Sequence, residues 1–206
     1  TGHPFEEFEA EVRPIISGRI ADVLGDRPPP SSEGYQFRGK PATVAGMVFD
    51  LGKRGGRIIF TLDDRSGRLE ASMFEETWQQ YRSLIAKSAI LIVEGSLRFD
   101  EYTEGWRLTA KRVIDIDQAR EQHARRLLLR WPDDAGRDFV KTLEQTLRPY
   151  RGGRCAIVVR YRNRAARADL VLSEEWSVKP TRELTERLAQ LCGADGVRLL
   201  YGPRDT

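Results

Sequence analysis

Apolar and polar side chains alternate most regularly between Gly56 and Phe74, and this pattern predicts a β-hairpin. The polar stretch from Asp64 to Gly67 favours a tight turn, because Asp and Ser bond to nearby backbone groups and Gly accepts a positive φ. Phe74 is out of phase with the apolar set, and we expect it to be exposed. The apolar set, which we expect to face a core, is Ile58, Phe60, Leu62, Leu69, Ala71 and Met73.

The segments on both sides of this hairpin complete a small barrel. A strand at 42–49 and a basic glycine-rich loop at 51–56 precede it. The order of three strands, a helix and two strands predicts a five-stranded OB-fold barrel over residues 41–116. Gly46 and Gly95 fit this barrel, because they lie where its strands must bend sharply. After the hairpin we expect a helix at 75–87, strands at 89–97 and 106–114, and a long polar loop at 99–105 between these strands.

From Asp117 onward, short strands alternate with helices in the order β-α-β-β-α-β. This order predicts a small α+β domain over residues 117–206. Asp133 or Asp134 is expected to cap the first helix, and Pro180-Thr181 to open the second. After a connecting helix at 117–126, the expected elements are strand 127–131, helix 135–148, strands 154–161 and 168–172, a helix ending at Cys192, and strand 197–201.

Residues 1–40 are expected to form a short helix at 4–13 and a Pro-rich linker at 25–41. Thr1 is not an initiator Met, which predicts that the chain begins inside a longer polypeptide. No apolar run approaches the roughly 18–20 residues of a membrane span. Because the two cysteines, Cys155 and Cys192, do not suggest a disulfide framework, we expect a cytoplasmic protein.

The net charge of +3 is distributed unevenly. Residues 41–116 carry 11 basic and 11 acidic side chains, whereas residues 117–206 carry 18 and 13, a net charge of +5. The predicted barrel therefore has no cationic field over its whole surface, and any contact with nucleic acid there must come from a local cluster.

Two groups of side chains could provide such a cluster. In the basic loop, glycines allow close approach of a phosphate and three cations supply counter-charge, although a merely solvated turn is the alternative. Aromatic rings in or beside the long loop could stack on bases, with core packing as the alternative. The candidate nucleic-acid-binding residues are Lys53, Arg54, Arg57, Phe99, Tyr102 and Trp106, together with Arg107 and Lys111 on one face of the last barrel strand.

Catalytic patterns are few. His3 and His123 are isolated, and the Asp63-Asp64 pair is typical of a turn rather than of a metal site. No P-loop, zinc pattern or dinucleotide-binding glycine pattern occurs, so we expect no catalytic residue, cofactor or metal in this chain. The densest basic run, Arg160 to Arg167, could contact phosphate, contact an acidic partner, or only keep a hairpin soluble.

Several segments resemble the C-terminal region of bacterial DNA polymerase III alpha subunits. The most specific are Thr61 to Glu70, which reads TLDDRSGRLE, and Ile114 to Arg120, which reads IDIDQAR; Thr1 to Pro4 and Lys53 to Gly55 add to them. The resemblance implies that the OB domain contacts single-stranded template and that residues 117–206 bind the tau subunit of the clamp loader. It also implies that Gly196 to Tyr201 contacts the sliding clamp weakly. The catalytic aspartates of this DNA-directed DNA polymerase lie upstream in the family and have no match here.

Two other functions remain open at this point. The hairpin is also similar to that of an OB-fold anticodon-binding module of an aminoacyl-tRNA synthetase, which would prefer a folded tRNA loop. Alternatively, the chain is a purely protein-interaction module in which residues 117–206 carry the function.

Overall fold

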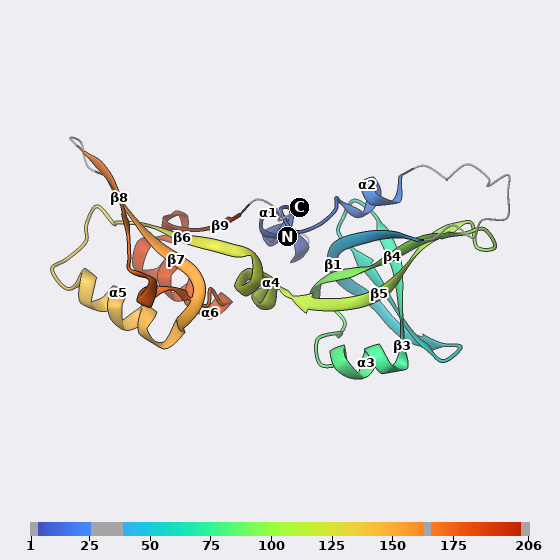
Figure 1. Ribbon diagram of the computed structural model, residues 1–206. Coiled ribbons are helices and arrows are strands. Elements are labelled where there is room, and N and C mark those ends of the chain that lie inside the picture. Colours follow the sequence, from blue (N-terminus) through green and yellow to red (C-terminus); the bar gives the residue numbers. More distant parts are fainter. Residues whose placement is uncertain (1–3, 26–38, 163–165, 203–206) are drawn as a thin grey trace. The chain divides into compact units, whose positions relative to one another are not determined.

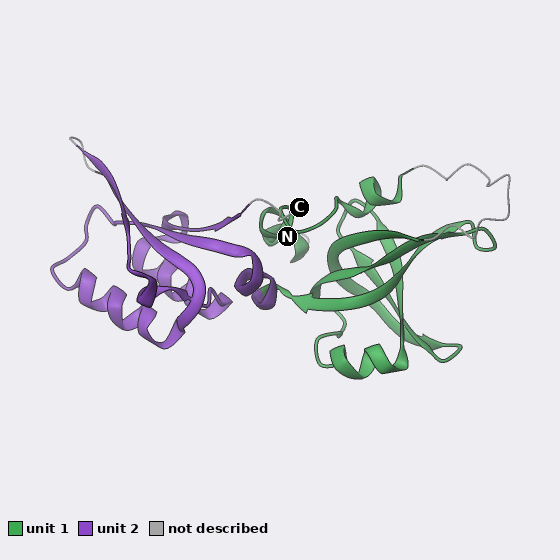
Figure 2. Ribbon diagram, in the orientation of Figure 1, with its two compact units in different colours: residues 1–116 green, residues 117–206 purple. Residues whose placement is uncertain are grey.

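The computed structural model describes residues 4–25, 39–162 and 166–202 (Figure 1). The chain divides into two compact units, residues 1–116 and residues 117–206 (Figure 2). Each unit has its own cluster of buried apolar side chains. Most of the Pro-rich linker expected at 25–41, and residues 163–165 of the basic run, lie outside the described residues.

Unit 1 contains a closed barrel of five strands in the order β1-β2-β3-β5-β4. The parallel pairing of β3 with β5 closes the barrel, whereas the other neighbours are antiparallel. The OB-fold expected from the sequence is confirmed, with its helix α3 between the third and fourth strands. The bounds are β1 Lys40–Arg54, β2 Arg57–Asp63, β3 Arg68–Phe74, α3 Glu75–Tyr81, β4 Ile90–Asp100 and β5 Gly105–Asp115.

The hairpin of β2 and β3 fills much of the barrel core. All six of its apolar side chains that were expected to face inward are buried, and Phe60 is only 1% exposed. Burying a large apolar side chain contributes about 1.5–3 kcal/mol to stability, so this hairpin is a major source of stability for the unit. Phe74 points outward and is 50% exposed, as expected.

Two glycines allow the barrel strands to bend. A Cβ atom on Gly95 would lie 2.2 Å from the backbone oxygen of Thr109, so a side chain cannot fit there. A Cβ atom on Gly46 would lie 3.1 Å from the backbone nitrogen of Asp63. The register of β4 against β5 shifts at Gly95, which leaves Lys111 as the extra residue of a β-bulge.

The strands are longer than the sequence pattern predicted. The first strand was expected to end at Phe49, but β1 continues to Arg54 because Gly52 and Lys53 pair with β2. The expected basic loop at 51–56 is therefore the end of a strand plus a turn. The expected long loop at 99–105 is likewise a short turn at 101–104, because Phe99 pairs with Trp106.

The N-terminal segment packs on the barrel. Ile20 and Val23 belong to the barrel core. The carboxylate of Asp64, in the turn between β2 and β3, accepts a hydrogen bond of 2.7 Å from the backbone N–H of Ile20. This bond fixes the start of a helix that the sequence pattern did not predict. The elements are a 3-10 turn η1 Pro4–Glu7, α1 Glu9–Val12 and the additional helix α2 Ile20–Leu24.

Unit 2 is a four-stranded sheet in the order β8-β7-β6-β9. The order β-α-β-β-α-β is confirmed. Thr181 caps α6 by accepting a 3.3 Å hydrogen bond from the backbone N–H of Leu184, whereas α5 begins at Phe139, later than expected, and neither Asp133 nor Asp134 caps it. The elements are α4 Ile116–His123, β6 Ala124–Arg130, α5 Phe139–Leu147, η2 Arg148–Tyr150, β7 Arg151–Arg162, β8 Arg167–Val171, η3 Glu174–Trp176, α6 Arg182–Cys192, η4 Ala194–Gly196 and β9 Val197–Tyr201.

In the described ranges, no helix is long and apolar enough to cross a membrane. Over those same ranges, no group of three or more His, Cys, Asp or Glu side chains is placed to hold a metal ion.

Candidate nucleic-acid interface

Three candidate cations gather at the tip of the hairpin formed by β1 and β2, which we call the β1–β2 tip (residues 53–57). Gly55 and Gly56 form its two-residue turn, with φ of 56° and 76°. A turn with positive φ at both positions fits the right-handed twist of the flanking strands and favours glycine. Arg54 and Arg57 pair directly across the turn, and Lys53 precedes them; all three are exposed.

The three cations differ in how much of their charge is neutralised. Lys53 Nζ lies 3.0 Å from Glu75 Oε2, and this hydrogen bond lowers the pKa of Glu75. Arg57 lies over the ring of Phe74, with its Cζ atom 4.3 Å from the ring centroid. No acidic side chain among the described residues pairs with Arg54 or Arg57. The β1–β2 tip therefore presents two guanidinium groups whose charge is available to a ligand.

The aromatic candidates lie at the second tip, formed by β4 and β5, which we call the β4–β5 tip (residues 99–106). Phe99 and Trp106 pair across the strands and contact each other edge to face, with 5.4 Å between ring centroids. Lys40 Nζ lies 5.3 Å from the centroid of the Trp106 ring. Tyr102, in the turn, is 96% exposed. Figure 1 shows both tips projecting to the right of unit 1.

The candidate cations on β5 have different surroundings. Arg107 forms ion pairs with Glu70 (3.3 Å) and with Asp100 (3.1 Å), so its charge is shared with two carboxylates. Lys111 occupies the bulge and is exposed, with no ion pair to any described residue. The expected alternation of Arg107 and Lys111 on a regular strand is interrupted by this bulge.

The structure adds one pair that sequence reasoning missed. Phe49 is 48% exposed, and the Cζ atom of Arg68 lies 3.7 Å from its ring centroid. The register of β1 shifts between Val48 and Asp50, which makes Phe49 the extra residue of a bulge. A bulge changes which face a side chain occupies without leaving a sign in the hydrophobic pattern, so alternation alone could not place Phe49.

The outer face of β2 and β3 consequently carries an arginine–phenylalanine pair at each end. Arg57 and Phe74 are cross-strand partners at one end, and Arg68 lies at the other, paired with Asp63. Glu70 lies between them, and its carboxylate is paired with Arg107. The face therefore combines aromatic rings and guanidinium groups, which together can bind stacked bases and phosphates.

Two protein families match parts of this chain. Residues 42–116 match the family described as an OB-fold nucleic acid binding domain. Residues 142–193 match the DNA polymerase III subunit alpha, C-terminal domain. Among solved structures, asparaginyl-tRNA synthetase from Pyrococcus horikoshii is 25% identical, with a TM-score of 0.34 over 38% of this chain and 20% of that chain.

Curated relatives match nearly the whole chain. The DNA polymerase III subunit alpha of Escherichia coli (strain K12) is 38% identical over 208 residues, which cover 98% of this chain and 17% of the relative. The corresponding protein of Pseudomonas aeruginosa is 36% identical over 211 residues, or 98% of this chain and 16% of the relative. The chain thus spans about a sixth of the length of these relatives, and this portion is not the catalytic one. The chain belongs to the DNA polymerase III alpha-subunit family and corresponds to its C-terminal region.

Proposed function

We propose that this chain is the non-catalytic C-terminal part of a cytoplasmic replicative DNA polymerase and that its barrel binds single-stranded DNA template. The observation that carries this proposal is the outer face of β2 and β3, where Arg57 stacks on Phe74 and Arg68 stacks on Phe49. The β1–β2 tip adds cations beside that face. In OB-folds, strands 2 and 3 with the loops on either side form the usual binding surface for oligonucleotides.

Binding would combine two terms. Arg54, Arg57 and Lys53 would displace counterions from phosphates, after Lys53 exchanges Glu75 for a phosphate oxygen. Exposed rings, Tyr102 above all, would stack on bases without regard to sequence. Because residues 41–116 carry no net charge, the affinity of this domain is expected to be modest and strongly dependent on salt.

A salt-dependent titration of the 206-residue chain with a labelled single-stranded oligonucleotide tests this proposal. The variant Lys53→Ala/Arg54→Ala/Arg57→Ala should bind weakly, and the slope of log K against log salt should fall by about 2, since each single-strand phosphate contact contributes about 0.7. The matched control Arg13→Ala/Arg82→Ala/Lys87→Ala removes the same charge from other exposed positions of unit 1. If the first variant binds as tightly as this control, the β1–β2 tip is not the binding site.

We also propose that unit 2 docks the tau subunit of the clamp loader. A groove of about 230 Å³ between α5 and the segment after β8 is lined mostly by apolar side chains, and Val140 on its rim is 60% exposed. Leu170 on β8 is 54% exposed. Exposed apolar patches of this kind mark protein–protein contact surfaces. The groove residues are Val140, Leu143, Glu144, Leu147, Leu172 and Trp176.

A pull-down with the tau subunit tests the docking proposal. Val140→Glu should weaken capture, whereas Lys141→Glu, the next residue on the same helix and also exposed, should not. Capture that survives deletion of residues 120–206 would refute the assignment of tau docking to unit 2. The expectation that Gly196 to Tyr201 contacts the sliding clamp stays a prediction; most of this segment forms β9, which is paired with β6.

The same experiments separate the two other functions. Preference for a folded tRNA loop over single-stranded DNA would favour an anticodon-binding module. Tau capture without any binding of DNA would favour a purely protein-interaction module.

A further inference from the structure

The strand register of unit 2 gathers six arginines on one face of its sheet. Residues paired across neighbouring strands project to the same face, and alternate residues of a strand share it. Arg130 pairs with Arg160, and Arg162 pairs with Arg167. On the other side, Leu128 pairs with Arg198. We call this surface the arginine face; its cations are Arg126, Arg130, Arg160, Arg162, Arg167 and Arg198.

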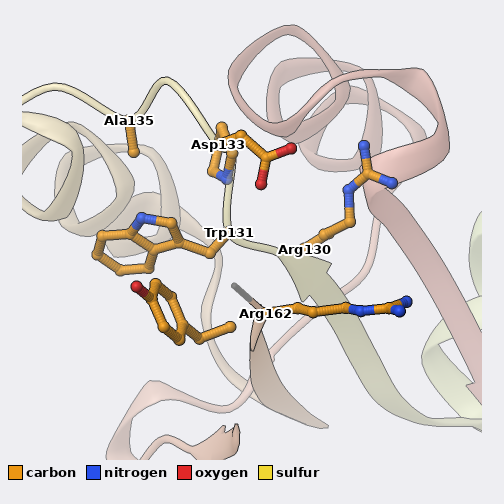
Figure 3. A pocket seen from close by; sticks show the side chains of 7 residues that line it. Arg130, Trp131, Asp133, Ala135 and Arg162 are labelled. Carbon is orange, nitrogen blue, oxygen red and sulfur yellow. The ribbon is translucent and has the colours of Figure 1, made fainter. Parts of the chain in front are cut away.

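Helices α5 and α6 cover the opposite face. Leu127, Leu129, Ile157 and Val159 alternate with the residues of the arginine face, and they belong to one buried cluster with the apolar side chains of α5 and α6. A pocket of about 940 Å³ lies where β6 and β7 end (Figure 3). Figure 3 shows the side chains of Arg130 and Arg162 extending away from Trp131. The indole of Trp131 packs against Phe139, 4.6 Å between ring centroids, on the helix side.

Most of the charge on the arginine face is not neutralised. Arg160 donates two hydrogen bonds of 2.8 Å to Asp169, and this pairing lowers the pKa of Asp169. The other five arginines are exposed, and none forms an ion pair with a described residue, although Arg167 interacts electrostatically with Asp169. Asp133 lines the pocket beside Arg130, but no ion pair joins the two side chains.

The centre of the arginine face is apolar. Val158, at its centre, is only 6% exposed although α5 and α6 lie on the other side. Its cross-strand neighbours are Leu128 and Val171. Arginine stems can cover apolar surface while their guanidinium groups stay in water, although Val171 at the edge of this strip is 68% exposed. A solvated sheet face needs no such concentration of one sign.

We propose that the arginine face binds the phosphate backbone of duplex DNA independently of its sequence. Guanidinium groups bind phosphate oxygens with paired hydrogen bonds, and their like charges are spread over four strands. No aromatic residue lies on the face itself; the nearest rings, Trp131 and Tyr161, line the pocket at its end and contact each other, with 6.2 Å between ring centroids. The face therefore offers a single strand less stacking surface than the barrel does. The exposed groove for a protein partner lies at α5, on the helix side. The proposal is independent of single-strand binding by the barrel.

The test uses the full chain with the barrel site disabled by Lys53→Ala/Arg54→Ala/Arg57→Ala and a short blunt-ended DNA duplex as probe. In that background, Arg126→Ala/Arg130→Ala/Arg198→Ala should strongly weaken the duplex binding that the background retains. The salt slope of the retained binding should exceed that of the variant by about 3, since each duplex phosphate contact contributes about 0.9.

The matched control removes three arginines from the helix side, each paired with a glutamate one turn away: Arg148→Ala/Arg182→Ala/Arg187→Ala. Equal duplex affinity of the two triple variants, or no duplex binding by the background, would overturn the proposal. Polyglutamate serves as a second probe, in place of an acidic protein. If the triple variant of the arginine face lost binding to polyglutamate but kept its duplex binding, the face would serve an acidic protein and the proposal would also be overturned. Circular dichroism melts of both variants check that the fold is retained.

Discussion

Asp64 links the barrel hairpin to the N-terminal segment. Its side chain is 5% exposed and accepts hydrogen bonds from the backbone N–H groups of Ile20, Ser66 and Gly67, and from the hydroxyl of Ser66. The sequence pattern identified this residue correctly as part of a turn. Its second role, capping a helix 44 residues earlier in the chain, depends on tertiary structure that no local pattern contains.

We predict that Asp64→Ala destabilises unit 1 by about 2–3 kcal/mol, because buried N–H groups lose a charged acceptor. Urea unfolding monitored by circular dichroism measures the effect. Asp63→Ala is the control: its carboxylate accepts hydrogen bonds from the exposed Arg68 side chain and from the backbone N–H of Arg65, and its loss should cost about 1 kcal/mol. Equal effects of the two substitutions would contradict the capping role.

Cys155 offers a prediction about pH. Burial raises the pKa of its thiol to about 12, from a model-compound value of 9.0. A raised pKa in the folded state means that the thiol stabilises the fold fully below pH 9, and that this contribution is lost as the pH rises from 9 toward 12. Between pH 9 and 12, the free energy of unfolding of the wild type should therefore fall by about 1.4 kcal/mol more per pH unit than that of Cys155→Val. Parallel curves of unfolding free energy against pH would refute this.

At the scale of elements, the sequence pattern predicted which strands and helices form better than where they end. The β2–β3 hairpin, the helix after it and the order of unit 2 follow from periodicity, because their apolar side chains face one core. The end of β1 does not follow from it. Gly52, Lys53 and Arg54 read as a loop locally, yet pairing with β2 holds them in a strand.

The same limit applies to the candidate site. Its cations could be predicted because they cluster in the sequence, as could the exposure of Phe74. The Phe49–Arg68 pair could not, because a bulge places Phe49. Nor could the ion pairs of Arg107, since Glu70 and Asp100 approach it only when β3 and β4 flank β5. The arginine face likewise needs the strand register, which pairs Arg130 with Arg160 and Arg162 with Arg167.

The β1–β2 tip provides a prediction at this scale. Replacing both turn residues by alanine forces two non-glycine residues into left-handed backbone, at about 1–2 kcal/mol each. We expect Gly55→Ala/Gly56→Ala to lower stability and to weaken single-strand binding, because the tip cations lose their fixed spacing. The single change Gly55→Asn suits the same turn, so this variant should keep the stability and the single-strand binding that the double-alanine variant loses. The measurements are urea unfolding and the oligonucleotide titration; unchanged values for the double-alanine variant would mean that this turn does not position the cations.

At the scale of the whole molecule, two units with separate cores carry different charges. The barrel region is electrically neutral and holds the three most exposed aromatic rings of the described residues, Phe49, Phe74 and Tyr102, whereas residues 117–206 carry a net charge of +5. Separate cores allow each unit to change its surface without loss of the other's fold. This division is consistent with one unit that contacts bases and another that contacts phosphates and a protein partner.

Separate cores also predict separate unfolding. The four tryptophans divide evenly between the clusters: Trp78 and Trp106 pack in unit 1, and Trp131 and Trp176 in unit 2. We expect two urea transitions when fluorescence is recorded from Trp78→Phe/Trp106→Phe and from Trp131→Phe/Trp176→Phe variants. Asp64→Ala should then lower the urea midpoint only of the transition that the unit 1 tryptophans report. Leu143→Ala opens a cavity in the core of unit 2. It should lower the free energy of unfolding of unit 2 alone, by about 2–5 kcal/mol. If each substitution moved both transitions equally, the two units would be folding as one cooperative body, because energy lost in one core would then be felt in the other.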